Sequence, residues 1–126
     1  MTTQIKQDIA QGQTNLRLLI GRFSDFLPDS RTRDENLTDF LTLLFHVTSS
    51  LFMSESAALR LTNLTREQCE DHHIQHGDML AIMLDATSRY KASMDDVECM
   101  AAVKEFGERF LDHTESYDAL VLANLA

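Results

Sequence analysis

The sequence predicts an all-α fold, an antiparallel up-down-up-down four-helix bundle that forms a single domain over residues 1–126. Apolar residues recur at steps of three and four along most of the chain, and no segment shows the sustained alternation of a strand. The 126 residues include one Pro and four Gly, so little of the chain is suited to linkers. Four helical segments of roughly 22–30 residues with short connections are typical of an antiparallel bundle.

The first two expected helices cover residues 4–26 and 34–61. Pro28 ends the first of them, because a proline disfavours the helical conformation in the residue before it. The inner face of the second helix is predicted from the recurrence of residues at steps of three and four. These residues are Leu37, Leu41, Leu44, Thr48, Leu51, Glu55 and Ala58.

The third helix is expected to begin at a capping box, in which Gln68 follows Thr65 by three residues, and to end near Lys91. Ser93 is the expected N-cap of the fourth helix, which continues through Leu120. The predicted inner face of the third helix consists of Cys69, His72, His76, Met79, Met83 and Ala86. That of the fourth consists of Val97, Met100, Val103, Phe106, Phe110, His113, Tyr117 and Leu120.

The composition disfavours several classes of function. With 20 acidic and 11 basic residues, the formal net charge of −9 repels phosphate backbones, so we expect no nucleic-acid partner. No apolar run approaches the ~20 residues that cross a bilayer. The polar N-terminal segment lacks the apolar centre of a signal peptide, so we expect no membrane partner and a cytoplasmic location. Cys69 and Cys99 are too few for a disulfide framework and are expected to be buried thiols.

Ionisable residues occupy four positions that the apolar period assigns to the core, namely Glu55, His72, His76 and His113. Burying such groups without partners costs on the order of several kcal/mol each. His72 and His76 are four residues apart, so their imidazoles project from adjacent turns of one helix face. That spacing lets two nitrogens reach one metal ion at about 2.0–2.1 Å. A bound divalent cation would satisfy these groups.

Asp118 adds a second carboxylate, although its spacing from His113 is unfavourable in a regular helix. Five residues at about 100° each place it about 140° round the helix from His113. Pointing both side chains at one ion therefore needs a local distortion, or an ion that lies off the helix axis. Three imidazoles and two carboxylates suit iron, with zinc or manganese as alternatives. The candidate metal ligands are His72, His76, His113, Glu55 and Asp118.

The order of these motifs along the chain, Glu, then HxxxH, then HxxxxD, resembles the hemerythrin family, including the bacteriohemerythrins. Residues 51–55 (LFMSE) resemble the family's H-F-x-x-E motif except at the first position. Gln13 is followed by apolar residues three, seven and ten positions later, the frame of the family's first-helix motif, but with Gln in place of a His ligand. The resemblance spans nearly the whole chain and implies a hemerythrin-like bundle that binds non-haem iron.

In that family the Glu and the Asp bridge two irons, and the resemblance implies that His72, His76 and His113 are the further ligands of one iron. The ligands of the other iron correspond to Leu51 and Gln13. Leucine cannot donate to a metal, and a Gln carbonyl is a weak substitute for imidazole. We therefore expect one ion, with mononuclear iron favoured over di-iron or zinc. Oxygen carriers of the family use one electron from each of two irons, so reversible oxygen carriage is not expected of this site.

We expect the metal to bind or sense a small ligand, either oxygen, nitric oxide or an anion, or to report the redox state. A signalling protein is expected as a further partner. No acid–base pair or substrate pocket can be named, so an enzymatic role is less favoured.

One alternative is a metal-free four-helix interaction module derived from a hemerythrin-like fold. Another keeps two ions, with water or Gln13 completing the second site. The metal, its ligand and the oligomeric state are left open by the sequence.

The remaining histidines are expected to lie away from the centre. His46 precedes Glu55 by nine residues, which is about 180° round an ideal helix. His73 points about 100° from His72, so it is expected beside the site or in solvent. Glu70 and His73 form an ExxH pair of the ferritin-like kind, but that architecture needs a second such pair on another helix, and the sequence has none.

Overall fold

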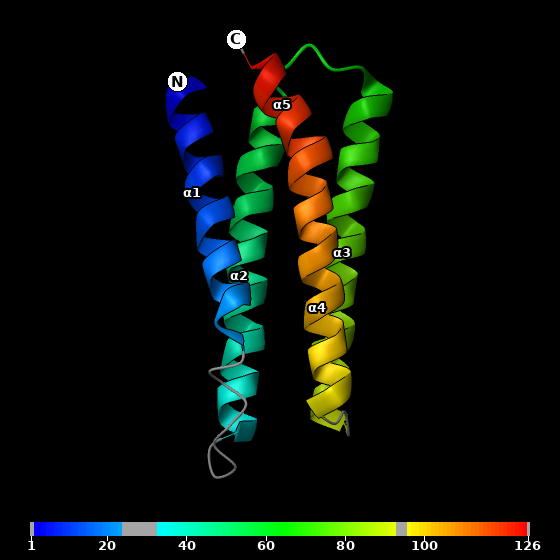
Figure 1. Cartoon of the computed structure of the whole chain (residues 1–126). Helices are drawn as coiled ribbons and strands as arrows, with labels where there is room; N and C mark the ends of the chain where they lie inside the picture. The colour runs from blue at the N-terminus through cyan, green and yellow to red at the C-terminus, as the bar shows by residue number, and fades with distance from the viewer. Residues whose placement is uncertain (1, 24–32, 93–95, 126) are drawn as a thin grey trace.

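The computed structural model describes residues 2–23, 33–92 and 96–125, and within these ranges the chain is helical with no strand. The elements are α1 (Thr2–Gly21), α2 (Arg33–Leu59), α3 (Arg66–Ala92), α4 (Asp96–His113), the π-helical turn η2 (Thr114–Asp118) and the short α5 (Ala119–Asn124). The prediction of an all-α bundle is confirmed. Figure 1 shows α1 and α3 running in one direction and α2 and α4 in the other.

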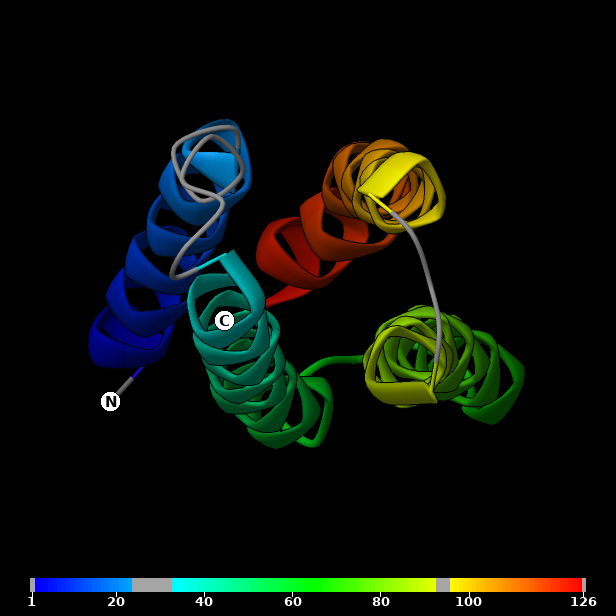
Figure 2. The ribbon, with the colours of Figure 1, turned by 90° about the horizontal axis from the view of Figure 1, so that it is seen from below.

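The four long helices surround a shared interior. In the end view of Figure 2 they stand at the corners of an open quadrilateral, and α1 packs on α2, α2 on α3, α3 on α4 and α4 on α1. Each helix turns one apolar stripe inward, as amphipathic helices of a bundle do. The largest fully buried apolar side chains are Ile9, Leu16, Phe40, Leu41, Leu44, Leu51, Met79, Phe106 and Phe110.

Helix α1 ends at Gly21, five residues earlier than predicted. The Arg22 N–H is shared between the carbonyls of Leu18 and Leu19, at 3.1 and 3.2 Å. Such bifurcated bonds are common at helix termini, and glycine is a poor helix former, so the helix weakens before any proline is reached. Pro28 and the expected cap Ser93 lie outside the described residues.

The capping box at the start of α3 is confirmed. The Thr65 N–H donates to Gln68 Oε1 at 2.9 Å, and the Gln68 N–H donates to Thr65 Oγ1 at 3.1 Å. Before it, the Leu61 N–H bonds the Ala58 carbonyl three residues back, which closes α2 two residues earlier than expected. Thr62 then forms an isolated bridge with Leu125, so the α2–α3 connection is held against the end of the chain's last helix.

The predicted inner faces are confirmed for the described side chains of α2 and, apart from the half-buried Cys69, of α3, and they need two corrections in the last helix. The side chains of Leu37 and Val97, which were also predicted to face inward, lie outside the described part of the structure. Met100 is 48 % exposed, because the buried stripe runs through Cys99 and Val103 instead. Leu120 is 38 % exposed and Val121 is fully buried, because η2 adds one residue to a turn and moves the inner face one position along the chain.

The two cysteines differ in burial and are not joined. Cys99 is buried as expected, whereas Cys69 is half-buried. Within the ranges that the structure describes, no helix is long and apolar enough to cross a membrane.

Candidate metal centre

Five ionisable side chains meet inside the bundle, in the half nearest the α2–α3 connection. Glu55 comes from α2, His72 and His76 come from α3, and His113 and Asp118 come from the end of α4 and from η2. All five are buried, with exposed fractions between 0 % for Glu55 and 6 % for His76. One potential ligand atom from each lies within 4.8 Å of all the others. The structure therefore brings together every candidate ligand that the sequence predicted.

A single oxygen of Glu55 is the centre of this cluster. Its Oε1 lies 3.0 Å from Nε2 of His72, 3.1 Å from Nε2 of His76 and 2.9 Å from Nε2 of His113. A neutral imidazole carries one N–H, so donation by all three rings to one oxygen needs each proton on Nε2, the nitrogen that faces inward. Three Nε2 atoms directed at one point are also the arrangement by which imidazoles hold a metal.

Asp118 approaches the same point from the other side. Its Oδ1 lies 2.9 Å from Nε2 of His113 and 3.5 Å from Nε2 of His72. Its Oδ2 accepts a hydrogen bond of 2.9 Å from the side-chain amide of Gln13, which is buried in α1. The carboxylate is thus oriented by α1, with one oxygen directed at the histidines and the other occupied by an amide donor.

The π-helical turn explains how His113 and Asp118 share one face. The Ala119 N–H bonds the Thr114 carbonyl, five residues earlier, where an α-helix would bond four residues back. This wider turn absorbs one extra residue, so residues five apart are aligned as residues four apart are in an α-helix. His113 and Asp118 are accordingly 0 % and 1 % exposed. The distortion that the HxxxxD spacing required is present.

Several polar atoms of the cluster have no hydrogen-bond partner. Among the described residues, Glu55 Oε2 and His113 Nδ1 are buried without one, and Asp118 Oδ1 makes no hydrogen bond of good geometry although it lies 2.9 Å from Nε2 of His113. A buried polar atom left unpaired costs roughly 1–3 kcal/mol, and more when the group is charged. A cation between the carboxylates and the imidazoles would engage Asp118 Oδ1 directly, so the donor set fits a metal ion better than it fits a closed hydrogen-bond network.

The metal-free cluster has strongly shifted pKa values. Burial alone would raise the pKa of Glu55, but the hydrogen bonds from the three histidines hold it well below its usual range. Burial would lower the pKa of His113, but the carboxylates of Asp118 and Glu55 raise it to about 9. Burial and the adjacent Glu55 charge raise the pKa of Asp118 to about 6, against the effect of His113. Burial lowers the pKa of His76, opposed by Glu55.

These shifts describe a site with excess negative charge. Without a metal, the two carboxylates draw a proton onto His113 or share one between them. A divalent cation would supply two positive charges, which the two carboxylates would balance while the three imidazoles stay neutral.

Aromatic rings fix the orientation of two imidazoles. The ring of Phe52 stacks on that of His76, with centroids 3.9 Å apart and planes 5° apart. Tyr117 stacks on His113 with centroids at 5.3 Å and planes 13° apart. These contacts hold the Nε2 atoms toward Glu55 and exclude water from the rings. One feature of the sequence indicates this place for Phe52, since Phe52 precedes Glu55 by three residues and so lies on the same helix face.

The positions that the resemblance assigned to a second ion are filled by other contacts. Leu51 is 2 % exposed and packs against Gly12, where an added Cβ would lie 2.8 Å from Leu51 Cδ1. Gln13 directs its amide N–H at Asp118. One of these positions therefore holds an apolar side chain, and at the other Gln13 presents the N–H of its amide to Asp118.

The remaining histidines lie outside the cluster. His46 and His73 are exposed, which agrees with the prediction for each. Comparisons of the chain with known protein families, with curated proteins and with solved structures find no match. The functional argument therefore rests on the residues and their geometry.

Proposed function

We propose that the chain is a hemerythrin-like bundle of up-down-up-down topology that holds one metal ion, with iron favoured, and binds or senses a small diatomic ligand or anion there. The alternating helix directions in Figure 1 support the topology. The order of the ligand-type residues along the helices supports the resemblance.

One observation carries the metal proposal. Imidazole nitrogens from two helices lie within 3.1 Å of one buried carboxylate oxygen, and a second carboxylate lies 2.9 Å from one of them. As a purely structural network this arrangement is inefficient, because it leaves Glu55 Oε2 and His113 Nδ1 buried without a hydrogen-bond partner and gives Asp118 Oδ1 only an ion-pair contact with His113. As a set of metal ligands it is chemically coherent, since three nitrogens and two oxygens suit iron or zinc.

The surroundings of Asp118 support a single ion. Its Oδ2 already accepts the Gln13 amide hydrogen, and the other position that the resemblance assigns to a second ion is Leu51, a buried side chain without a donor atom. With monodentate carboxylates, five protein donors leave an octahedral iron with an open position, at which a small external ligand would bind. The protein's own part is to hold the donors in place and to keep the position dry.

The test is a metal count on the purified chain after anaerobic reconstitution with ferrous iron and, separately, with zinc. We expect about one ion per chain and a large loss in His72→Ala and His113→Ala. His46→Ala, which changes an exposed histidine of α2, is the matched control and should bind as the unaltered chain does.

The alternatives predict different counts. Two irons per chain with the spectrum of an oxo-bridged pair would replace the mononuclear proposal with a di-iron one. No bound metal under any of these conditions would exclude both and leave the metal-free interaction module as the function to pursue.

A further inference from the structure

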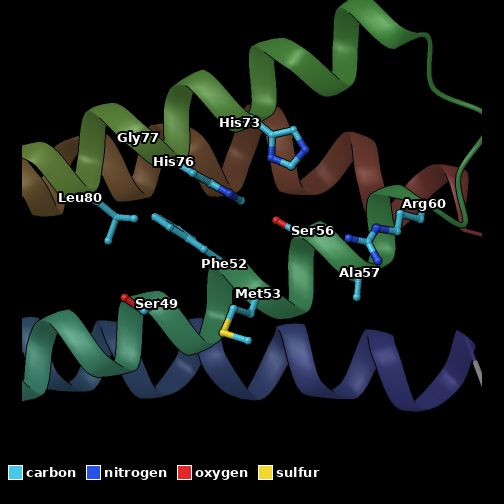
Figure 3. A pocket seen from close by; sticks show the side chains of 10 residues that line it. All are labelled: Ser49, Phe52, Met53, Ser56, Ala57, Arg60, His73, His76, Gly77 and Leu80. Atoms are coloured by element: carbon cyan, nitrogen blue, oxygen red, sulfur yellow. The ribbon is translucent and has the colours of Figure 1, made fainter.

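A groove between α2 and α3 lies directly beside the metal centre. It encloses about 610 Å³, and Phe52, Met53, Ser56, Arg60, His73 and His76 are among the residues that line it. Figure 3 shows the stacked rings of Phe52 and His76 between the two helices, with Arg60 and His73 farther along the groove toward the α2–α3 connection.

The stacked rings of Phe52 and His76 lie between the groove and the ligand cluster. His76 lines the groove, and its Nε2 also lies 3.1 Å from Glu55 Oε1. Phe52 stacks on His76 and its centroid lies 5.9 Å from that of His113, so it contacts two of the candidate ligands. Phe52 is only 4 % exposed. A rotation of its side chain would open the groove onto the cluster.

The charge of the groove is opposite to that of the chain. The formal net charge is −9, yet among the described residues no carboxylate lines the groove, whereas Arg60 and His73 do. None of the ion pairs among the described residues includes Arg60. The Ser56 hydroxyl points across the groove toward α3 in Figure 3. A cationic side chain, an imidazole and a hydroxyl in one concave site attract and bind anions.

Two other grooves of the described part of the chain fit this role less well. The one that includes Leu51 and His46 encloses about 240 Å³ and carries the Asp8 carboxylate, which repels anions. The apolar groove between α1 and α4, lined by Ile20 and Leu111, includes none of the five candidate ligands.

We propose that the α2–α3 groove is the entrance through which a small anion reaches the metal, with Phe52 as its gate and Arg60 as the charge that attracts the anion. This inference rests on the proposed function, since an entrance needs an ion behind it. Phe52 and Arg60 are positioning residues and need not coordinate the metal.

The experiment follows the binding of azide, a small linear anion, to protein loaded with Co²⁺, whose visible spectrum reports a change of ligand. In stopped-flow mixing, Phe52→Ala should raise the association rate about tenfold or more, and Phe52→Leu should raise it less, because leucine fills more of the gate. Arg60→Gln should lower the rate severalfold at low salt and weaken its dependence on ionic strength, since steering by an exposed charge is screened by salt.

Two matched controls isolate the entrance. Leu84→Ala truncates an apolar residue of α3 that is 54 % exposed and does not line the groove. Arg66→Gln removes the same charge from an exposed ion pair with Glu70, outside the groove. Both should leave the azide rate unchanged within about twofold. Arg60→Gln alters an exposed side chain, so it remains informative even where a Phe52 variant folds poorly.

The outcomes separate the two proposals. If Co²⁺ is bound at about one ion per chain and the Phe52 and Arg60 variants take up azide at the unaltered rate, the entrance is wrong and the metal centre stands. If neither Co²⁺ nor iron is retained, the proposed function fails and the entrance fails with it.

Discussion

Nε2 of His113 lies 2.9 Å from Oδ1 of Asp118, although five residues separate them along one helix. In a regular α-helix that separation places two side chains about 140° apart. The π-helical turn η2 (Thr114–Asp118) removes the offset by fitting one extra residue into a turn. The same extra residue puts Val121, rather than Leu120, in the core. The shape of the metal centre and the packing of α5 therefore have one cause.

Deletion of Ser116, an exposed residue of η2, tests this account. The shortened turn should close as an α-helix with Asp118 four positions after His113, so both side chains and Val121 stay on the inner face. We expect a folded protein that still binds about one metal ion per chain. The measurements are a metal count and urea unfolding.

Deletion of Glu108 is the matched control, because this residue is also exposed but lies in the regular helix α4. Because η2 begins only after His113, the residues between the deletion and η2 rotate by about 100°, and His113 leaves the cluster. This variant should lose metal binding and most of its stability. Equal loss of metal in both deletions would contradict the role assigned to η2.

Much of the fold and of the site follows from local regularities. The steps of three and four placed Glu55, His72 and His76 on inner faces, and all three are buried there. The capping box at Thr65 involves residues three apart, so short-range geometry alone defines it. Four of the five ligand-type residues could be named because each lies at an inner position of a helix whose period is visible in the sequence, whereas Asp118 was named against that period.

Other features depend on contacts that periodicity does not encode. An α turn and a π turn differ by one residue, so the period assigned Leu120 to the core, and only the HxxxxD spacing signalled a distortion. The bond from Gln13 to Asp118 joins residues 105 positions apart. The stacking of Phe52 on His76 crosses two helices. Such contacts depend on the relative placement of helices, which the sequence pattern leaves open.

The substitution Glu55→Gln tests whether the buried cluster contributes more to stability than an ion pair on the surface does. The substitution keeps the size of the side chain and removes the charge that three Nε2 atoms approach. Removing one partner of a buried ionic cluster typically costs about 3–5 kcal/mol, so the metal-free variant should unfold at much lower denaturant. Its metal content should also fall far below one ion per chain. Urea unfolding and metal analysis measure the two effects.

Glu70→Gln is the control for that substitution, since Glu70 forms an exposed ion pair with Arg66 at 3.0 Å. Exposed pairs contribute roughly 0–1 kcal/mol, so this variant should be close to the unaltered chain in stability and in metal content. If Glu55→Gln were no less stable than Glu70→Gln, the cluster would not be the ionic centre described here.

Removal of the metal should lower the melting temperature. An ion present at a hundred times its dissociation constant stabilises the folded state by about 2.7 kcal/mol. For a domain of this size that corresponds to a shift of roughly 10 °C. Calorimetry of zinc-loaded and chelator-treated protein measures the shift, and His72→Ala should show almost none. An unchanged melting temperature in the unaltered chain would favour the metal-free interaction module.

The stability of the metal-free protein should fall as the pH rises, because of the proton that His113 binds. Its pKa rises from 6.5 to about 9 in the folded chain, so the folded state binds the proton more tightly than the unfolded state does. The resulting stabilisation is complete below pH 6.5 and is lost as the pH rises to about 9, on the order of 3 kcal/mol in all. Metal binding must displace that proton, so affinity should rise by up to about tenfold per pH unit over the same interval. Urea unfolding at pH 6 and pH 9, with chelator competition for zinc at pH 7 and pH 8, measures both trends. His113→Gln should remove the loss of stability with rising pH, whereas the control His46→Gln should keep it. A stability that rises from pH 6.5 to 9 would show that His113 is not the protonated partner of the two carboxylates.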